Sequence, residues 1–179
     1  VAGSALTTGG ENTAVGRASL FAGTTGTQNV AVGVESLSGN TTGQYNVAVG
    51  YKALDANTTA SNNTAVGKGA MLLNTTGDYN TAIGLTSLSA NTTGRFNTAS
   101  GADALLRNTT GNSNTATGYA SLEDNTTAAN NSAYGNNSLA NTTTGANNTA
   151  VGYQSGIANT TGTLNTFIGK IAGSANTTG

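Results

Sequence analysis

The sequence predicts an all-β fold, a fibrous parallel β-solenoid of about ten coils with 17 residues in each coil. Asn recurs at every seventeenth residue, Gly follows four residues after each of these Asn, and no step slips. An inserted residue would turn stacked side chains onto the wrong face, so this strict period indicates stacked repeats. Gly, Asn and Thr dominate, and no apolar spacing of three and four persists, which excludes helical repeats. The recurring residues are Asn12, Asn29, Asn46, Asn63, Asn80, Asn97, Asn114, Asn131, Asn148 and Asn165, with Gly16, Gly33, Gly50, Gly67, Gly84, Gly101, Gly118, Gly135, Gly152 and Gly169.

We number the repeat from this Asn as positions 0 to 16 and expect the first strand at positions 1 to 3. Position 3 is mostly β-branched, as Val66 and Ile83 are, which suits a strand. Position 1 is Thr or Val except at Ser132. Because positions 1 and 3 share one face of an extended strand, we expect both to point into the coil.

Position 2, on the other face, is Ala in nine repeats and Phe167 in the tenth. An open surface would not restrict this position to a small residue, so we expect another chain to pack closely there. The candidate contacts between chains are Ala14, Ala31, Ala48, Ala65, Ala82, Ala99, Ala116, Ala133 and Ala150.

Position 8 is apolar in most repeats and follows a small Ser or Ala, which predicts a second buried column and a second short strand in each coil. The column consists of Leu20, Leu37, Leu54, Met71, Leu88, Leu105, Leu122 and Leu139.

The remaining positions are typical of corners. Gly at position 4, and Gly or Ala at position 14, fit tight bends, and the Asn-Thr-Thr before position 14 can hydrogen-bond the local backbone. Asn at position 0 and, in most repeats, at position 11 should stack into amide ladders. The stretch SLANTTTGANN places Asn141 one residue early, so the loop there must differ while the next strand stays in register.

Residues 1–179 are therefore expected to form one repeat array, with no atypical capping repeat at either end. At about 4.8 Å per coil the rod would be roughly 48 Å long. We expect a segment, or a stacking subunit, of a longer fibre.

Charge and cysteine content limit the partners. Charged residues are 7% of the chain and the net charge is −1, which gives no electrostatic reason to expect nucleic acid or an anionic membrane as partner. Without Cys there is no disulfide framework, and no apolar run approaches the roughly 20 residues of a membrane span.

The block Asn-Thr-Ala-Val-Gly-x-x-Ser-Leu resembles the head repeats of trimeric autotransporter adhesins (YadA-like), whose motif is Asn-Ser-Val-Ala-Ile-Gly-x-x-Ser. The longer form, GDYNTAIGLTSLSANTTGRFNTASG, is similar to repeats ahead of chaperone-processed endings of phage-type tail fibres. The resemblance covers essentially the whole chain, although the adhesin-head coil is usually shorter. It implies a left-handed β-roll, assembled as a trimeric fibre that projects from a cell or virion and serves adhesion or reach.

Residues for catalysis are scarce, and we expect no enzyme, cofactor or metal site. The absence of His and Cys excludes Ser-His-Asp and Cys-His catalysis and the usual zinc sites. Glu123 and Asp124 are the only adjacent acids, and their alternating directions in an extended segment argue against a shared acid/base site.

Two sets of side chains could instead bind ligands. Tyr51, Tyr119 and Tyr153 share position 5 and could stack on sugars, although Lys68 and Asn136 interrupt the stripe. The Thr at position 12 could present a regular array to ice; examples are Thr41, Thr58, Thr75, Thr92 and Thr109.

Every Asn-Thr-Thr also begins an Asn-x-Thr sequon, which would carry a glycan if the source organism glycosylates Asn, although turn chemistry explains the motif equally well. The candidate acceptors are Asn40, Asn57, Asn74, Asn91, Asn108, Asn125, Asn141, Asn159 and Asn176.

The expected function is therefore that of a structural fibre segment, a rigid extracellular or virion shaft supporting adhesion or self-assembly. The alternative is a repetitive surface that binds ice or glycan through the Thr or Tyr columns. The expected partner is the chain itself, as a homotrimer or end-to-end filament, with a cell-surface receptor or glycan as a further candidate. The expected location is extracellular, on a cell surface or on a virion.

Overall fold

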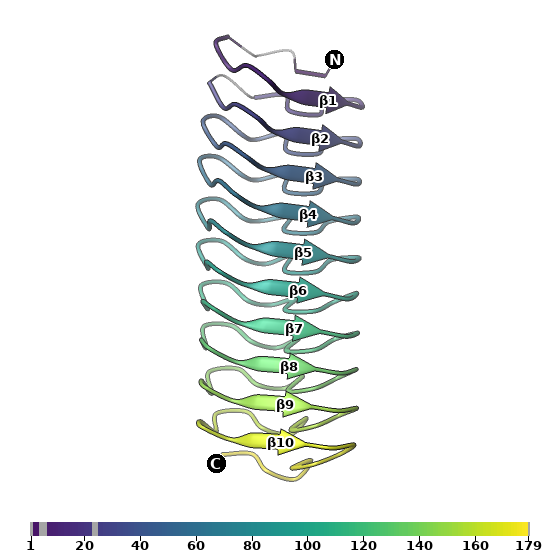
Figure 1. Cartoon of the computed structure of the whole chain (residues 1–179), viewed down its shortest axis with the longest axis vertical. Helices are drawn as coiled ribbons and strands as arrows, with labels where there is room; N and C mark the ends of the chain where they lie inside the picture. The colour runs from purple at the N-terminus through teal and green to yellow at the C-terminus, as the bar shows by residue number, and fades with distance from the viewer. Residues whose placement is uncertain (1, 4–6, 23–24, 179) are drawn as a thin grey trace.

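The computed structural model describes residues 2–3, 7–22 and 25–178, and residues 1, 4–6, 23–24 and 179 of the expected array lie outside them. Ten three-residue strands form one parallel sheet in sequence order, each paired with its equivalent 17 residues away. This confirms the predicted parallel β-solenoid (Figure 1). The strands are β1 (Thr13–Val15), β2 (Val30–Val32), β3 (Val47–Val49), β4 (Thr64–Val66), β5 (Thr81–Ile83), β6 (Thr98–Ser100), β7 (Thr115–Thr117), β8 (Ser132–Tyr134), β9 (Thr149–Val151) and β10 (Thr166–Ile168).

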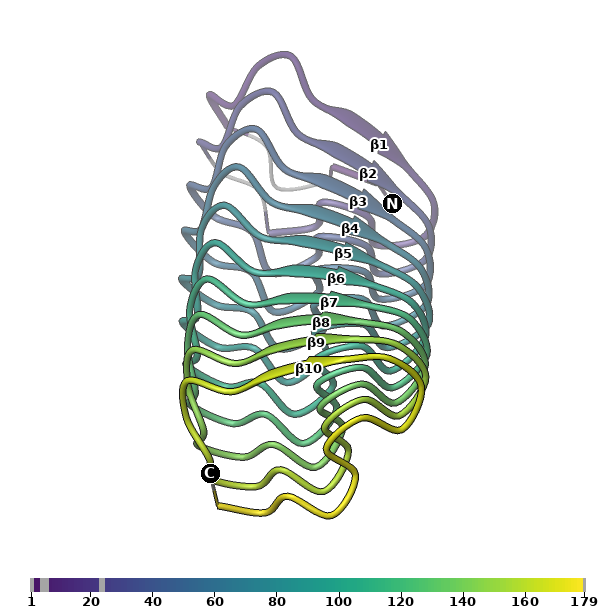
Figure 2. The ribbon, with the colours of Figure 1, turned by 60° about the horizontal axis from the view of Figure 1, so that its bottom comes forward.

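Coil n is named here for its strand βn and runs from position 0 to position 16. In Figure 1 the strands cross the front from left to right while the chain descends, and the return segments lie behind, so the coil is left-handed. Figure 2 shows the coils stacked in phase, with the strands along one wall. Each coil therefore rests only on its neighbours, as in other solenoids.

The expected second strand is wrong, because the rest of each coil is bent. Non-glycine residues at positions 6, 8 and 16 adopt left-handed backbone angles, such as Lys52 (φ 54°), Leu54 (φ 55°) and Tyr45 (φ 58°). Each such residue costs about 1–2 kcal/mol. Hydrogen bonds between coils offset this cost, as where Leu54 N–H donates to the Ala70 carbonyl at 2.9 Å.

The glycine at position 4 is required by its geometry. Gly84 has φ +139°, and a Cβ there would lie 2.5 Å from the carbonyl oxygen of Gly101 in the next coil. This confirms the predicted tight bend, since only a residue without a side chain can turn here while the coils stay stacked.

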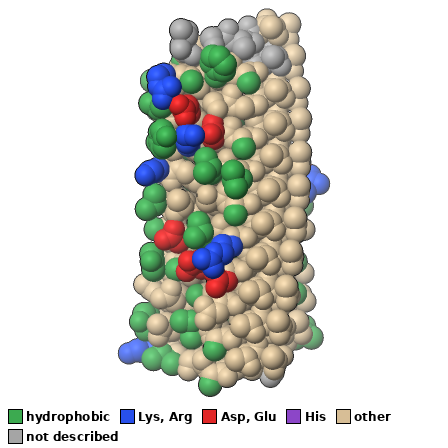
Figure 3. Space-filling view, turned by 180° about the vertical axis from the view of Figure 1, so that it is seen from behind, with side chains coloured by type: hydrophobic (Ala, Val, Ile, Leu, Met, Phe, Trp, Pro, Cys, Tyr) green, Lys and Arg blue, Asp and Glu red, His purple; other side chains and the backbone are tan. Residues whose placement is uncertain are grey.

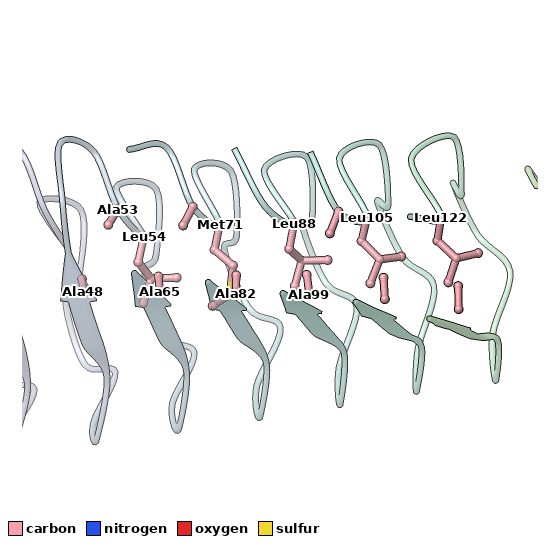
Figure 4. Packing of buried hydrophobic residues seen from close by; sticks show 14 of the residues in the cluster. Ala48, Ala53, Leu54, Ala65, Met71, Ala82, Leu88, Ala99, Leu105 and Leu122 are labelled. Carbon is pink, nitrogen blue, oxygen red and sulfur yellow. The ribbon is translucent and has the colours of Figure 1, made fainter. Parts of the chain in front are cut away.

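The core lies between the strand wall and the bend at position 8. Ala from position 2 meets Leu or Met from position 8, and Figure 4 shows the two columns facing each other across the coil. Ala82 and Leu88, for example, have no exposed surface. The second buried column is therefore confirmed, although no strand carries it.

The predicted strand faces are reversed. Positions 1 and 3 point outward: Val15 is 57% exposed and Ile83 is 46% exposed. Position 2 points inward because the long Leu side chains fill most of the narrow coil and leave room only for a methyl group. The proposed contacts between chains are therefore wrong, since Ala14 packs partly buried on the core and the other eight have no exposed surface. These eight are Ala31, Ala48, Ala65, Ala82, Ala99, Ala116, Ala133 and Ala150.

Both predicted amide ladders are present and buried. At position 0, Asn46 donates its N–H and Nδ2 to Asn29 Oδ1 (3.0 and 3.2 Å) and its Nδ2 to the Ala60 carbonyl (2.9 Å). At position 11, Asn57 Nδ2 donates to Asn40 Oδ1 (2.8 Å) and to the same carbonyl (3.0 Å). These bonds pair buried amides without using charge.

Candidate functional surfaces

The sequons overlap the position 11 ladder, and the structure places most of their Asn inside it. Seven of the nine candidate acceptors are fully buried, namely Asn40, Asn57, Asn74, Asn91, Asn108, Asn125 and Asn159. A glycan on Nδ2 would have no space and would replace one of the two hydrogens that Nδ2 donates, as Asn57 donates to Asn40 Oδ1 and the Ala60 carbonyl. Asn176 is half-buried, and Asn141 is exposed.

Asn141 is exposed because the extra Thr moves it to position 10 and puts Thr142 in the ladder position. Thr142 Oγ1 donates to the Asn159 carbonyl at 2.9 Å. It supplies no donor to the previous coil, so Asn125 Oδ1 is buried without a hydrogen-bond partner. The altered loop was predicted from the sequence, and the break in the ladder is its structural consequence.

The Thr hydroxyls proposed for ice binding are occupied within the protein. At position 12 each Oγ1 donates to the carbonyl of the equivalent Thr in the next coil, as from Thr75 to Thr92 at 3.0 Å. The same bond is made by Thr41, Thr58, Thr92 and Thr109. Position 13 supplies one exposed Thr in each of coils 2 to 9, a single column along a corner.

The aromatic side chains lie on the surface, in different settings. Tyr51, Tyr119 and Tyr153 of position 5 are all exposed, as the proposed sugar stripe requires. Sequence reasoning missed Tyr134, which is also exposed because position 3 points outward. It also missed the pair at position 16, where the rings of Tyr79 and Phe96 stack with centroids 5.3 Å apart.

Charged residues pair both between neighbouring coils and within a coil. Arg17 bridges to Glu35 at 2.7 Å, and Lys52 contacts Glu35 at 3.4 Å and Asp55 at 3.7 Å. The hydrogen bond from Arg17, aided by Lys52, holds the pKa of Glu35 below its ordinary value, and Glu35 raises the pKa of Lys52. Figure 3 shows charged side chains of both signs together on the rear face, with uncharged surface around them.

Further ion pairs join Arg95 to Asp78 and Arg107 to Asp124. Asp124 therefore lies beside a guanidinium group, which is a setting typical of a surface ion pair.

The part of the chain that the structure describes contains no pocket and no group of three acidic residues that could hold a metal ion. No helix in that part is long and apolar enough to cross a membrane. Comparison with protein-family models, curated proteins and solved structures finds no match to this chain.

Proposed function

We propose that this chain is a rigid structural segment of a fibre, whose role is to hold what lies at its two ends at a fixed separation. The observation that supports this role most directly is the unbroken, in-register pairing of ten strands in sequence order. Backbone hydrogen bonds cross each boundary between coils, and the two buried amide ladders run parallel to them, the position 11 ladder with its break at Thr142. Length is then set by the number of coils, and bending strains all of these bonds together.

The proposed surroundings are extracellular, on a cell surface or on a virion, and this rests on the resemblance to adhesin and tail-fibre repeats. The proposed partner is a second copy of the chain, in a trimer or in an end-to-end filament. Since the Ala column lies inside the coil, lateral association would use the outward residues of the sheet or the corners. Electron microscopy with a symmetry search distinguishes three-fold rods from filaments.

The rod itself is tested by distance measurement between spin labels. The chain has no Cys, so labels on Thr42→Cys and Thr161→Cys are unique. Both residues are exposed and occupy position 13, seven coils apart. A rigid rod predicts one narrow distance distribution near 34 Å, seven strand spacings. A broad or much shorter distribution would refute the role of a spacer.

Deletions supply the matched control. Removing residues 80–96 takes out one whole coil and joins position 16 to position 0, so the labelled distance should fall by about 4.8 Å while the fold is kept. Removing residues 80–95 leaves one residue too many and shifts every later side chain to the wrong face. This second deletion should lose the narrow distribution. If both deletions behave alike, coil number does not set the length.

A further inference from the structure

Three exposed tyrosines occupy nearby repeat positions on three successive coils near the C-terminal end of the described rod. Tyr119 and Tyr153 occupy position 5 of coils 7 and 9, and Asn136 occupies the same position in coil 8 between them. Tyr134 lies two residues before Asn136, and β8 pairs it with Thr117 and Val151. The three Tyr are 54%, 44% and 46% exposed in chain order.

Backbone hydrogen bonds fix these corners relative to one another. Asn137 N–H donates to the Tyr119 carbonyl and Gln154 N–H donates to the Asn136 carbonyl, each at 2.9 Å. Tyr119 and Tyr153 are therefore two strand spacings apart, roughly 10 Å. The rings are carried on a rigid backbone, so a ligand would not have to order a loop on binding.

The surface around these tyrosines is uncharged. Positions 3, 5 and 6 of coils 7, 8 and 9 contain no charged residue. Besides the Tyr they supply three amide side chains, from Asn136, Asn137 and Gln154, of which Asn136 is exposed and the other two are partly exposed. Aromatic faces combined with amide donors and acceptors suit a ligand that has flat apolar faces and a rim of hydroxyl groups.

Tyr51 and the stacked pair at position 16 are engaged with their own neighbours. Tyr51 occupies the same position 5 in coil 3, but Lys52 Nζ lies 5.9 Å from its ring centroid and is itself paired with Glu35 and Asp55. Phe96 stacks on Tyr79 and has the Arg95 guanidinium 5.6 Å from its ring centroid. Among the residues the structure describes, Tyr119, Tyr134 and Tyr153 have no ring or cation partner.

We propose that Tyr119, Tyr134, Tyr153 and Asn136 form a binding surface for a neutral polysaccharide. The C–H faces of sugar rings carry partial positive charge and pack on the negative faces of the tyrosine rings. Their hydroxyl groups exchange hydrogen bonds with the Asn136 amide and the tyrosine hydroxyls. A chain lying along the rod axis contacts Tyr119 and Tyr153 through two of its sugar residues. Single contacts of this kind are weak, and several copies in a fibre would strengthen binding by multivalency.

The test is a depletion assay on the whole chain with insoluble microcrystalline cellulose, chitin and mannan, and with heparin beads as the charged comparison. The double variant Tyr119→Ala/Tyr153→Ala should reduce the partition coefficient on at least one neutral polysaccharide at least tenfold. The matched variant Tyr51→Ala should leave it unchanged. Half-molar salt should not weaken binding, since no charge is involved. Circular dichroism of each variant verifies the fold, which is expected to be retained because all three side chains are exposed.

Other outcomes overturn the proposal. These are no depletion by any of the three neutral polysaccharides, equal losses in the Tyr51 variant and the double variant, or binding to heparin that salt abolishes. None of them bears on the rod, which the distance measurement tests separately.

Discussion

Coils 2 to 7 and coils 8 to 10 form the same core with different residues. In coils 2 to 7 the inward strand position is always Ala, the facing position is Leu or Met, and position 11 is always Asn. In coils 8 to 10, Thr142 replaces an Asn, Gly156 and Gly173 replace Leu, and Phe167 replaces Ala. Both regions keep the same backbone, so the difference shows which features of the repeat are exchangeable.

Core volume is exchangeable between neighbouring coils. A Cβ built on Gly156 would lie 2.6 Å from a ring carbon of Phe167, and the ring also occupies the side-chain space of Gly173. One Phe thus replaces two Leu. Hydrogen bonding is not exchanged in this way, because Thr142 leaves the Oδ1 atom of Asn125 unpaired. Packing depends on total volume, whereas an amide ladder requires a donor at each step.

The largest expected effect comes from Phe167→Ala, which empties the space of two Leu side chains. Truncating a buried Phe costs about 3–5 kcal/mol. Because solenoid coils unfold locally, the loss should appear as faster hydrogen exchange in coils 9 and 10 while coils 3 to 6 stay protected.

The rescue variant for this substitution restores the consensus. Gly156 and Gly173 have φ of 62° and 65°, close to the 50° of Leu139, so Leu fits their backbone. Phe167→Ala/Gly156→Leu/Gly173→Leu should recover most of the protection. Failure to recover it would show that the ring does more than fill volume.

Asn91→Thr should have the next largest effect, because it transplants the natural ladder break into the regular region. Asn91 Nδ2 donates to Asn74 Oδ1 at 2.7 Å, and Asn91 Oδ1 accepts from Asn108 Nδ2 at 2.9 Å. Leaving a buried acceptor unpaired costs about 1–3 kcal/mol. Denaturant unfolding should shift to lower concentration, and Thr93→Ser at an exposed corner serves as the control. Equal stability of the two variants would mean that the ladder contributes little.

The reverse substitution, Thr142→Asn, should stabilise the chain. It supplies a donor to Asn125 Oδ1 and continues the position 11 column toward Asn159. Its gain should be smaller than the loss in Asn91→Thr, about 1 kcal/mol, because the Thr142 bond to the Asn159 carbonyl is lost in exchange. Calorimetry should show a rise of a few degrees in the melting midpoint. A fall would mean that the shifted loop cannot accept the consensus residue.

Much of this fold could be predicted from the sequence, but the direction of the strand faces could not. The period, the strands at positions 1 to 3, the bend at Gly84 and its equivalents, and the amide ladders all follow from spacing and residue type. Neither strand face carries charge, so residue type alone assigns β-branched Val to the core and Ala to a contact between chains. The opposite arrangement follows only from the length of the Leu88 side chain, which crosses the narrow coil to reach Ala. The bend at position 8 could not be predicted either, because Leu rarely adopts a positive φ and therefore does not indicate a bend.

The surface sites were harder to predict because they depend on exposure. Position 11 Asn was assigned both to a buried ladder and to glycosylation, and one side chain cannot do both. Asn141 is the exception, because it lies one position before the ladder position and is exposed. No periodic signal marks Tyr134 as a surface residue, whereas Tyr119 and Tyr153 share a repeat position.

The smallest expected effect concerns the charges of coils 1 to 3, which distinguish them from the uncharged tyrosine surface at positions 3, 5 and 6 of coils 7 to 9. Arg17 and Lys52 lower the pKa of Glu35 below its ordinary 4.5. A carboxyl group whose pKa is lowered in the folded state stabilises the fold at pH values above its unfolded-state pKa. This contribution is lost as the pH falls through its folded-state pKa. Glu35→Gln should therefore flatten the decline in stability below pH 4.5. The groups are exposed, so the effect should be slight and should disappear in high salt. An acid transition that keeps the same slope in the variant would show that this ion-pair cluster has no part in stability.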